Sequence, residues 1–224
     1  MHLDEARRRL ADLPRDLPAP GALPPPPAAI TAIRVDDIPY AEPELAVARL
    51  AGDRPFRAAA ALVLIVPDAA GAARLVLMRR TDDGGPHARQ VACPGGSVEA
   101  DDADEAAAAL REAEEEVGLD ARAAGVDVVG RLERIVVAAS GFVLDPFVAI
   151  AARPPDLTPN PVEVEAILTP LLDAFLPGAP IVVREETIRG ALIRYGGYPI
   201  DGGHVVWGAT ARILGQLAAV IGPA

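Results

Sequence analysis

Apolar residues run without a break from residue 58 to residue 66, and a run of this length predicts a buried β-strand. A second apolar segment covers residues 74–80, and Pro67 to Gly71 supplies the turn between the two. Similar apolar segments predict further strands over residues 126–137, 143–151 and 181–184. The middle of the chain is therefore expected to form most of a β-sheet.

Two longer segments, residues 103–117 and 206–220, carry apolar residues at helical spacing, and each predicts a helix with one apolar face. A shorter helix is expected near the N-terminus, where apolar residues repeat at the same spacing between residues 3 and 13. Strands and helices without regular alternation indicate a mixed sheet covered by helices. The predicted fold class is therefore α/β.

A proline-dense stretch separates the first helix from the rest of the chain. Residues 14–27 include four consecutive prolines, which can form neither a helix nor a central strand and predict an extended tether. The sequence is therefore divided into an N-terminal helix and proline-rich arm, residues 1–56, and a main domain, residues 57–224.

Composition narrows the class of partner. Hydrophobic residues make up 51% of the 224 residues, enough for a real core, while 32 acidic residues face 21 basic ones, all arginine, for a net charge of -11. An acidic surface repels nucleic acid and anionic membranes, so neither is an expected partner. With no secretory signal, no apolar run near 20 residues and one cysteine, we expect a cytoplasmic protein.

The densest chemical signal lies on the helix expected over residues 103–117. At about 100° per residue, Glu112, Glu115 and Glu116 share one side of that helix and repel one another. A hard divalent cation such as Mg²⁺ removes this repulsion and in turn binds phosphate oxygens. Upstream, Gly95 and Gly96 allow a backbone turn close to a ligand.

Other residues around this helix support or oppose that interpretation. Gly118 is placed to end the helix, and Arg111 could hold a glutamate through a two-point ion pair. Asp102 and Glu99 could contact metal-bound water or cap the helix. The alternative is that these glutamates form an ordinary solvated acidic face.

These residues resemble the Nudix box. Its second half is complete over residues 111–119, Arg-Glu-Ala-Glu-Glu-Glu-Val-Gly-Leu, and its first half is represented by Gly96 and Asp102. The spacing from Gly96 to Arg111 is one residue longer than the general pattern, as in the coenzyme A pyrophosphatase branch of the family. The resemblance implies a Nudix-type α/β/α sandwich with a mixed β-sheet, preceded here by the proline-rich arm.

The resemblance also implies an active site for a Nudix pyrophosphohydrolase. Mg²⁺ or Mn²⁺ would be held by Glu112, Glu115 and Glu116, and the general base would be Glu115 or Glu163. The expected catalytic set is Glu112, Glu115, Glu163 and Arg111. The residues expected to bind the substrate phosphates are Arg79, Arg80, Arg89, Gly95 and Gly96.

The favoured substrate is coenzyme A or acyl-coenzyme A, because several further stretches also resemble that branch. The branch signature upstream keeps its spacing, but Gly85, Arg89 and Cys93 replace its arginine, glycine and phenylalanine. ADP-ribose or NADH are therefore alternative substrates, and a non-catalytic nucleotide-sensing module is a minor alternative. The expected partner is a small nucleotide, with a homodimer as a candidate assembly.

Two further residues invite interpretation. Cys93 has no histidine near it in the sequence, so packing is favoured over a catalytic role. Trp207 is expected to anchor the last helix to the sheet.

Overall fold

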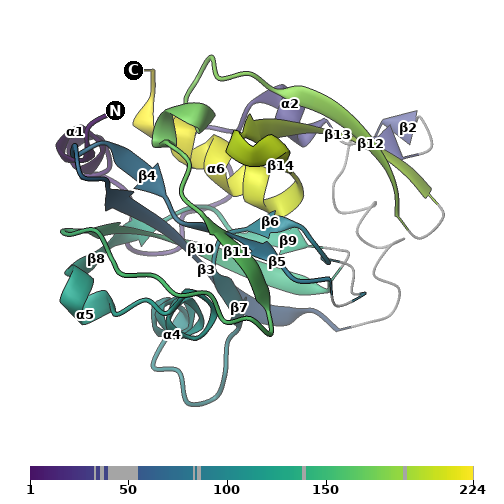
Figure 1. Ribbon diagram of the computed structural model, residues 1–224. Helices are drawn as coiled ribbons and strands as arrows, with labels where there is room; N and C mark the ends of the chain where they lie inside the picture. The colour runs from purple at the N-terminus through teal and green to yellow at the C-terminus, as the bar shows by residue number, and fades with distance from the viewer. Residues whose placement is uncertain are drawn as a thin grey trace.

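The largest sheet of the computed structural model has six strands and mixes the two pairing directions (Figure 1). The structure describes residues 1–32, 34, 35, 38, 39, 55–82, 84, 87–137, 140–188 and 191–223. Strand β3 (Arg57–Pro67) pairs in parallel with β10 (Phe142–Ala151). All the other pairings of this sheet are antiparallel. The prediction of a mixed sheet is confirmed.

The sheet order is β4-β3-β10-β8, with two short strands attached to its central pair. The added strands are β4 (Ala73–Leu75), β7 (Gly95–Ser97), β8 (Val126–Arg131) and β9 (Ile135–Val137). Strand β7 pairs with β3 and β9 pairs with β10. The segment predicted as one strand over residues 126–137 is therefore two strands.

Helices cover both faces of this sheet. Ala60, Leu62 and Leu64 of β3 pack under α4 (Glu105–Val117), whereas Ala61, Val63 and Ile65 face the opposite side. That opposite side is covered by α1 (Leu3–Arg9) and α6 (Gly208–Ile221), as Figure 1 shows. Because β3 is apolar on both faces, its sequence is a continuous apolar run. The predicted α/β/α sandwich is confirmed.

A three-stranded sheet continues from the edge of the sandwich. It contains β5 (Leu77–Arg80), β6 (Val91–Ala92) and β11 (Val164–Leu168), with β5 in the centre. The segment predicted as a single strand over residues 74–80 is divided at Val76, because β4 pairs with β3 while β5 pairs with β11 and β6. The short α5 (Ala121–Ala124) precedes β8.

A third sheet includes strands that the apolar pattern did not predict. Its members are β1 (Arg34–Val35), β2 (Ile38–Pro39), β12 (Val182–Ile188), β13 (Ala191–Ile200) and β14 (His204–Val206). Strand β13 contains Gly196 and Gly197, which resemble a turn in the sequence. In the structure, a Cβ on Gly196 would overlap the Ala29 carbonyl oxygen of α2 (Ala28–Thr31), so glycine permits this close packing.

The first residues of the chain pack against the large sheet and α6. Leu10 and Leu13 are buried, and the Pro14 carbonyl accepts a hydrogen bond from the Arg131 backbone N–H at 2.8 Å. Residues 40–54 of the arm, and Gly85 of the upstream branch signature, lie outside the described residues. Short 3-10 turns cover Leu172–Phe175 and Asp201–Gly203. In the described part of the chain, no helix has the length and apolar character needed to cross a bilayer.

Candidate functional site

Helix α4 is fixed at both ends by residues suited to those positions. The Asp104 side chain caps its start by accepting the Ala107 N–H at 2.8 Å. Gly118 ends it with φ +68°, a left-handed conformation that favours glycine. Ala109, Ala113 and Val117 are fully buried against the sheet, which turns the glutamate face toward β7. The predicted helix is thus confirmed, and Asp104 rather than Asp102 is its cap.

A side chain would be obstructed at both glycines before this helix, but by different neighbours. A Cβ on Gly95 would overlap the backbone of Ala60 in β3, and its φ of +157° also favours glycine. A Cβ on Gly96 would instead lie 2.5 Å from the carboxylate carbon of Glu112. Gly95 therefore permits close backbone packing, and Gly96 leaves room for a glutamate.

Glu112, Glu115 and Glu116 of α4, together with Glu163, are called the glutamate cluster below. Glu116 is its most enclosed carboxylate, with a side chain only 3% exposed. Its Oε2 accepts the Gly95 N–H at 2.9 Å, and its Oε1 lies 3.5 Å from Nη1 of Arg80. Burial raises the pKa of Glu116 to about 8, despite these two stabilising partners. The carboxylate is therefore held in place without its charge being fully compensated.

Glu112 lies beside Glu116 and is mostly buried. Burial raises its pKa, and the Arg111 guanidinium opposes that shift. The charges of Glu115 and Glu163 add to the increase, so they lie close enough to repel the Glu112 carboxylate. Glu115 is more accessible, with 56% of its side chain exposed.

Arg111 connects the glutamates to the loop before α4. It forms a two-point pair with Asp102, from Nε to Oδ1 at 3.0 Å and from Nη2 to Oδ2 at 3.1 Å. Its Nη1 donates to Glu112 at 3.1 Å and to Glu115 at 3.2 Å. Arg111 does hold glutamates, as expected, but its two-point pair is with Asp102. The Asp102 carboxylate is thereby committed to holding Arg111.

Glu163 reaches the cluster from a distant part of the sequence. The backbone N–H of Asn160 donates to the Glu116 carbonyl at the end of α4, at 2.9 Å. The Asn160 side chain accepts the Val162 N–H, and the Thr81 N–H donates to the Glu163 carbonyl. These bonds fix the loop that carries Glu163, whose charge raises the pKa of both Glu112 and Glu116.

Of the three arginines expected to bind phosphate, only Arg80 contacts the carboxylate cluster. Arg79 pairs with Glu165 at 2.9 Å and Arg89 pairs with Asp82 at 3.1 Å. Both of these carboxylates are well exposed to solvent. Arg79 and Arg89 thus each form an ion pair at the surface, away from the glutamates.

The donor chemistry of the cluster fits a divalent cation, although its side chains are directed at protein partners. Among the described His, Cys, Asp and Glu residues, no three side chains converge as a ready metal site. The glutamates of the cluster contact Gly95, Arg80 and Arg111 instead. Carboxylate oxygens are hard ligands, and the repulsion among these glutamates is the kind that Mg²⁺ or Mn²⁺ relieves.

Cys93 and Trp207 have the structural surroundings expected of them. Cys93 is buried in the core, and burial raises the pKa of its thiol to about 12, which disfavours the reactive thiolate. The Trp207 ring stacks on Tyr195 with 4.2 Å between ring centroids, immediately before α6.

Sequence reasoning did not identify Thr81 and Asn160 as the residues that hold Glu163. The Asn-Pro pair at 160–161 is a turn signal that could have suggested the role of Asn160. Nothing in the local pattern around Thr81 could have done so, because its bonds join segments 81 residues apart.

Comparison with known proteins gives consistent matches. A model of the NUDIX domain matches residues 55–187. Nudix hydrolase 22, chloroplastic, from Arabidopsis thaliana is 37% identical over 178 residues, 75% of this chain and 56% of the relative. The uncharacterized Nudix hydrolase NudL from Cronobacter sakazakii is 39% identical over 155 residues, 66% of this chain and 75% of the relative.

Among solved structures, a Nudix hydrolase from M. smegmatis aligns with a TM-score of 0.42 and 25% identity, over 54% of this chain and 73% of that one. The chain spans little more than half the length of the plant relative that it matches.

Proposed function

The chain belongs to the Nudix family, and we propose that it is a divalent-metal-dependent hydrolase that cleaves the pyrophosphate bond of a nucleoside diphosphate derivative. The observation that carries this proposal is that Glu116 and Glu112 lie against Gly95 and Gly96, with Glu115 and Glu163 near enough for their charges to raise the pKa of Glu112. The favoured substrate is coenzyme A or acyl-coenzyme A, which would give 3',5'-ADP and 4'-phosphopantetheine or its acyl form.

Glu112, Glu115 and Glu116 are the proposed ligands of Mg²⁺ or Mn²⁺. The bound cation would neutralise charge on the pyrophosphate oxygens and lower the pKa of an attacking water. The Gly95 N–H orients Glu116, and Arg111 orients Glu112 and Glu115. Arg111 is therefore proposed as a positioning residue, because each of its contacts is with the chain's own oxygens.

The proton acceptor is proposed to be Glu163, with Glu115 as the alternative. Glu115 already accepts a hydrogen bond from Arg111. The Glu163 side chain makes no hydrogen bond or ion pair with the described residues, and Glu163 is exposed beside the cluster. A free and accessible carboxylate is better suited to take a proton from water.

Substrate phosphates are proposed to contact Arg80 first, with Gly95 and Gly96 providing the close backbone approach. Arg79 and Arg89 can join them, because their exposed ion pairs are weak and can be exchanged for phosphate oxygens. All direct cationic contacts of this kind come from arginine, since the chain contains no lysine.

A substrate panel tests the proposal. Purified protein with Mg²⁺ or Mn²⁺ is incubated with coenzyme A, acetyl-coenzyme A, ADP-ribose and NADH, and the products are separated by chromatography. Release of 3',5'-ADP from coenzyme A at the highest kcat/KM supports the favoured substrate. Faster turnover of ADP-ribose or NADH would replace it with the second candidate while retaining the hydrolase.

The same panel addresses a non-catalytic, nucleotide-sensing module. Such a module would bind a nucleotide without turnover at any metal concentration. The presence of Glu112, Glu115 and Glu116 argues against it. A cytoplasmic location and a homodimer are also proposed, and light scattering after size-exclusion chromatography distinguishes one copy from two.

A further inference from the structure

Arg89 has a backbone conformation that disfavours its own side chain. The residue lies in the segment that joins β5 to β6, and its φ of +59° falls in the left-handed region. Among the described residues, every other position with a positive φ is a glycine. Glycine adopts this conformation freely, whereas a residue with a Cβ loses stability in it. Position 89 is therefore a strained point of the fold.

The hydrogen bonds of this segment explain the conformation but not the arginine. The Arg89 N–H donates to the Thr81 carbonyl at 3.3 Å, and the Arg80 N–H donates to the Gln90 carbonyl at 3.0 Å. The Gln90 N–H donates to the His87 carbonyl at 3.2 Å. These bonds require a turn with a left-handed residue at position 89. Glycine or asparagine would make the same bonds with less strain.

The contacts of the Arg89 side chain do not offset this strain. Its Nε lies 3.1 Å from Oδ2 of Asp82, and the two side chains are 64% and 56% exposed. An ion pair this exposed contributes less to stability than a left-handed backbone costs. Within the described part of the chain, the Arg89 side chain has no second partner. Uncompensated strain of this kind clusters at ligand-binding and catalytic sites.

Thr81 places Arg89 beside the glutamate cluster. The Thr81 carbonyl accepts the Arg89 N–H, while the Thr81 N–H donates to the Glu163 carbonyl at 2.9 Å. Arg80, the residue before Thr81, lies 3.5 Å from the Glu116 carboxylate. Arg89 is thus bonded to the same short backbone segment as the cluster. Its guanidinium nevertheless forms no ion pair with any of the four described glutamates.

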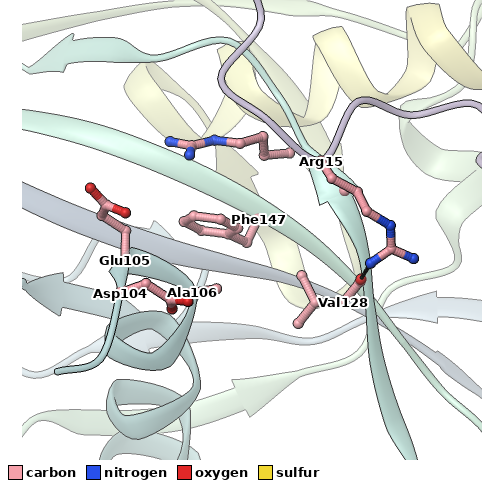
Figure 2. Close-up of a pocket in the computed structure, with 8 residues that line it drawn as sticks. Arg15, Asp104, Glu105, Ala106, Val128 and Phe147 are labelled. Atoms are coloured by element: carbon pink, nitrogen blue, oxygen red, sulfur yellow. Dashed lines mark hydrogen bonds between the residues drawn. The ribbon is translucent and has the colours of Figure 1, made fainter.

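The cleft at the start of α4 shows how arginines are held where no ligand is needed (Figure 2). Arg131 lines that cleft and pairs with Asp145, which is buried and also pairs with Arg134. Asp104 and Glu105 line the same cleft, so acids and arginines are present there together. A buried partner holds an arginine permanently, whereas an exposed partner can be exchanged for a ligand.

We propose that Arg89 recognises a phosphate monoester on the nucleoside of the substrate, distinct from the pyrophosphate that is cleaved. This inference rests on the proposed function, in which the pyrophosphate lies at the glutamate cluster beside Arg80. Because Arg89 does not contact the cluster, the anion that it meets is a second one on the same molecule. Phosphate oxygens can replace the exposed Asp82 carboxylate, and they match the guanidinium fork. Coenzyme A carries such a group, whereas ADP-ribose and NADH do not, so Arg89 determines the choice among these substrates.

Titration calorimetry in the presence of Mg²⁺ tests this inference with two ligands. The ligands 3',5'-ADP and 5'-AMP differ only in the phosphate monoester at the 3' position. We expect the wild type to bind 3',5'-ADP about tenfold more tightly than AMP. Arg89→Gln should lose this preference while its affinity for AMP is unchanged. Asp82→Asn should increase the preference about threefold, because it removes the carboxylate that competes for Arg89.

Two further variants separate charge from strain. Arg74→Gln is the matched control, because it removes the same charge from an arginine that pairs with Asp68 in β4. Its preference for 3',5'-ADP should equal that of the wild type. Arg89→Gly should lose the preference and yet raise the Tm by about 2–4 °C, because it relaxes the backbone. A merely structural role for Arg89 would lower the Tm instead.

Several outcomes would overturn the proposal. These are equal affinity of the wild type for the two ligands, an unchanged preference in Arg89→Gln, or a lower Tm in Arg89→Gly. An equal loss of affinity for both ligands in Arg89→Gln would assign Arg89 to the phosphate that they share. Turnover of coenzyme A that does not depend on Arg89 would refute this inference alone. A binding preference without turnover of any substrate would refute the hydrolase alone.

Discussion

The two ends of α4 differ in how their acidic and basic side chains are combined. Toward the C-terminal end, Glu116 lies beside Arg80 while Glu112 and Glu115 contact Arg111, and burial and mutual repulsion raise the pKa of Glu112 and Glu116. At the N-terminal end, Arg131 and Arg134 share the single carboxylate of Asp145. The C-terminal end therefore has more carboxylates than arginines, an arrangement that favours a cation.

An ordinary ion pair elsewhere in the molecule shows what these two places lack. Asp68 and Arg74 pair one to one at 3.0 Å, and the remaining Asp68 acceptor binds backbone N–H groups. No charge is left over there, and no ligand is needed. Unequal numbers of partly buried acids and bases are thus a more useful sign of a binding site than the number of charges.

The largest effect is expected from replacing Glu116, a proposed metal ligand near the C-terminal end of α4. We expect Glu116→Gln to slow pyrophosphate hydrolysis about a hundredfold or more, because it removes a ligand charge without changing side-chain volume. The amide oxygen can still accept the Gly95 N–H, so thermal unfolding should change little. Steady-state kinetics with Mg²⁺ measures the effect.

Glu114→Gln is the control for that variant, because Glu114 is exposed on another side of the helix and loses the same charge. Its rate should match the wild type. Wild-type turnover by Glu116→Gln would exclude Glu116 as a metal ligand.

The two glycines provide a second comparison. In Gly96→Ala, the new methyl group displaces the Glu112 carboxylate, so we expect activity to fall about tenfold to a hundredfold with little loss of stability. In Gly95→Ala, the methyl group meets the backbone of β3, so the free energy of unfolding should fall by about 1–3 kcal/mol. Kinetics and chemical denaturation separate the two effects, and full activity in Gly96→Ala would contradict this assignment.

Metal binding should distinguish the two ends of the helix. Saturating Mn²⁺ is expected to raise the Tm of the wild type by about 5 °C or more, because it binds only the folded state. The increase should be lost in Glu112→Gln and retained in Arg131→Gln, which changes the other end of α4. Differential scanning calorimetry gives the comparison, and an equal increase in both variants would show that the cation binds elsewhere.

The smallest expected effect concerns Asp102. The Arg111 side chain, followed by the Glu99 N–H, holds the Asp102 pKa below its ordinary value of 3.8. A lowered pKa stabilises the fold above that value, and the stabilisation is lost as the pH falls through the lowered pKa. Asp102→Asn should therefore have a lower Tm than the wild type at neutral pH, and the two Tm values should converge in acid. A difference independent of pH would exclude this ion pair as its cause.

The local apolar pattern predicted two kinds of element correctly: helices with one apolar face against the sheet, and strands that are buried on both faces. Helix α4, expected over residues 103–117, runs from Glu105 to Val117, and the strand expected over 58–66 is β3. Strand β13 was missed because close packing by α2 and β14 requires glycine where a strand would ordinarily carry a side chain. The division at Val76 was missed because the chain passes there from one sheet to another without any change in its apolar pattern.

The candidate site shows the same limit. Helical periodicity is enough to place Glu112, Glu115 and Glu116 on one face of a helix. The proximity of Glu163 depends on hydrogen bonds from Asn160 and Thr81, which join distant segments. The partners of Arg79 and Arg89 could not be anticipated either, because many acidic residues in this chain are equally available by sequence.

The contact between the arm and β8 affects how much of the sheet's edge is left open. Strand β8 is at the end of its sheet, and the arm bonds two of its backbone groups: Pro14 accepts the Arg131 N–H, and the Arg15 side chain donates to the Val128 carbonyl. A free strand edge is a template for pairing with other molecules. The arm thus covers part of the β8 edge, and its prolines cannot themselves extend the sheet because they lack a backbone N–H.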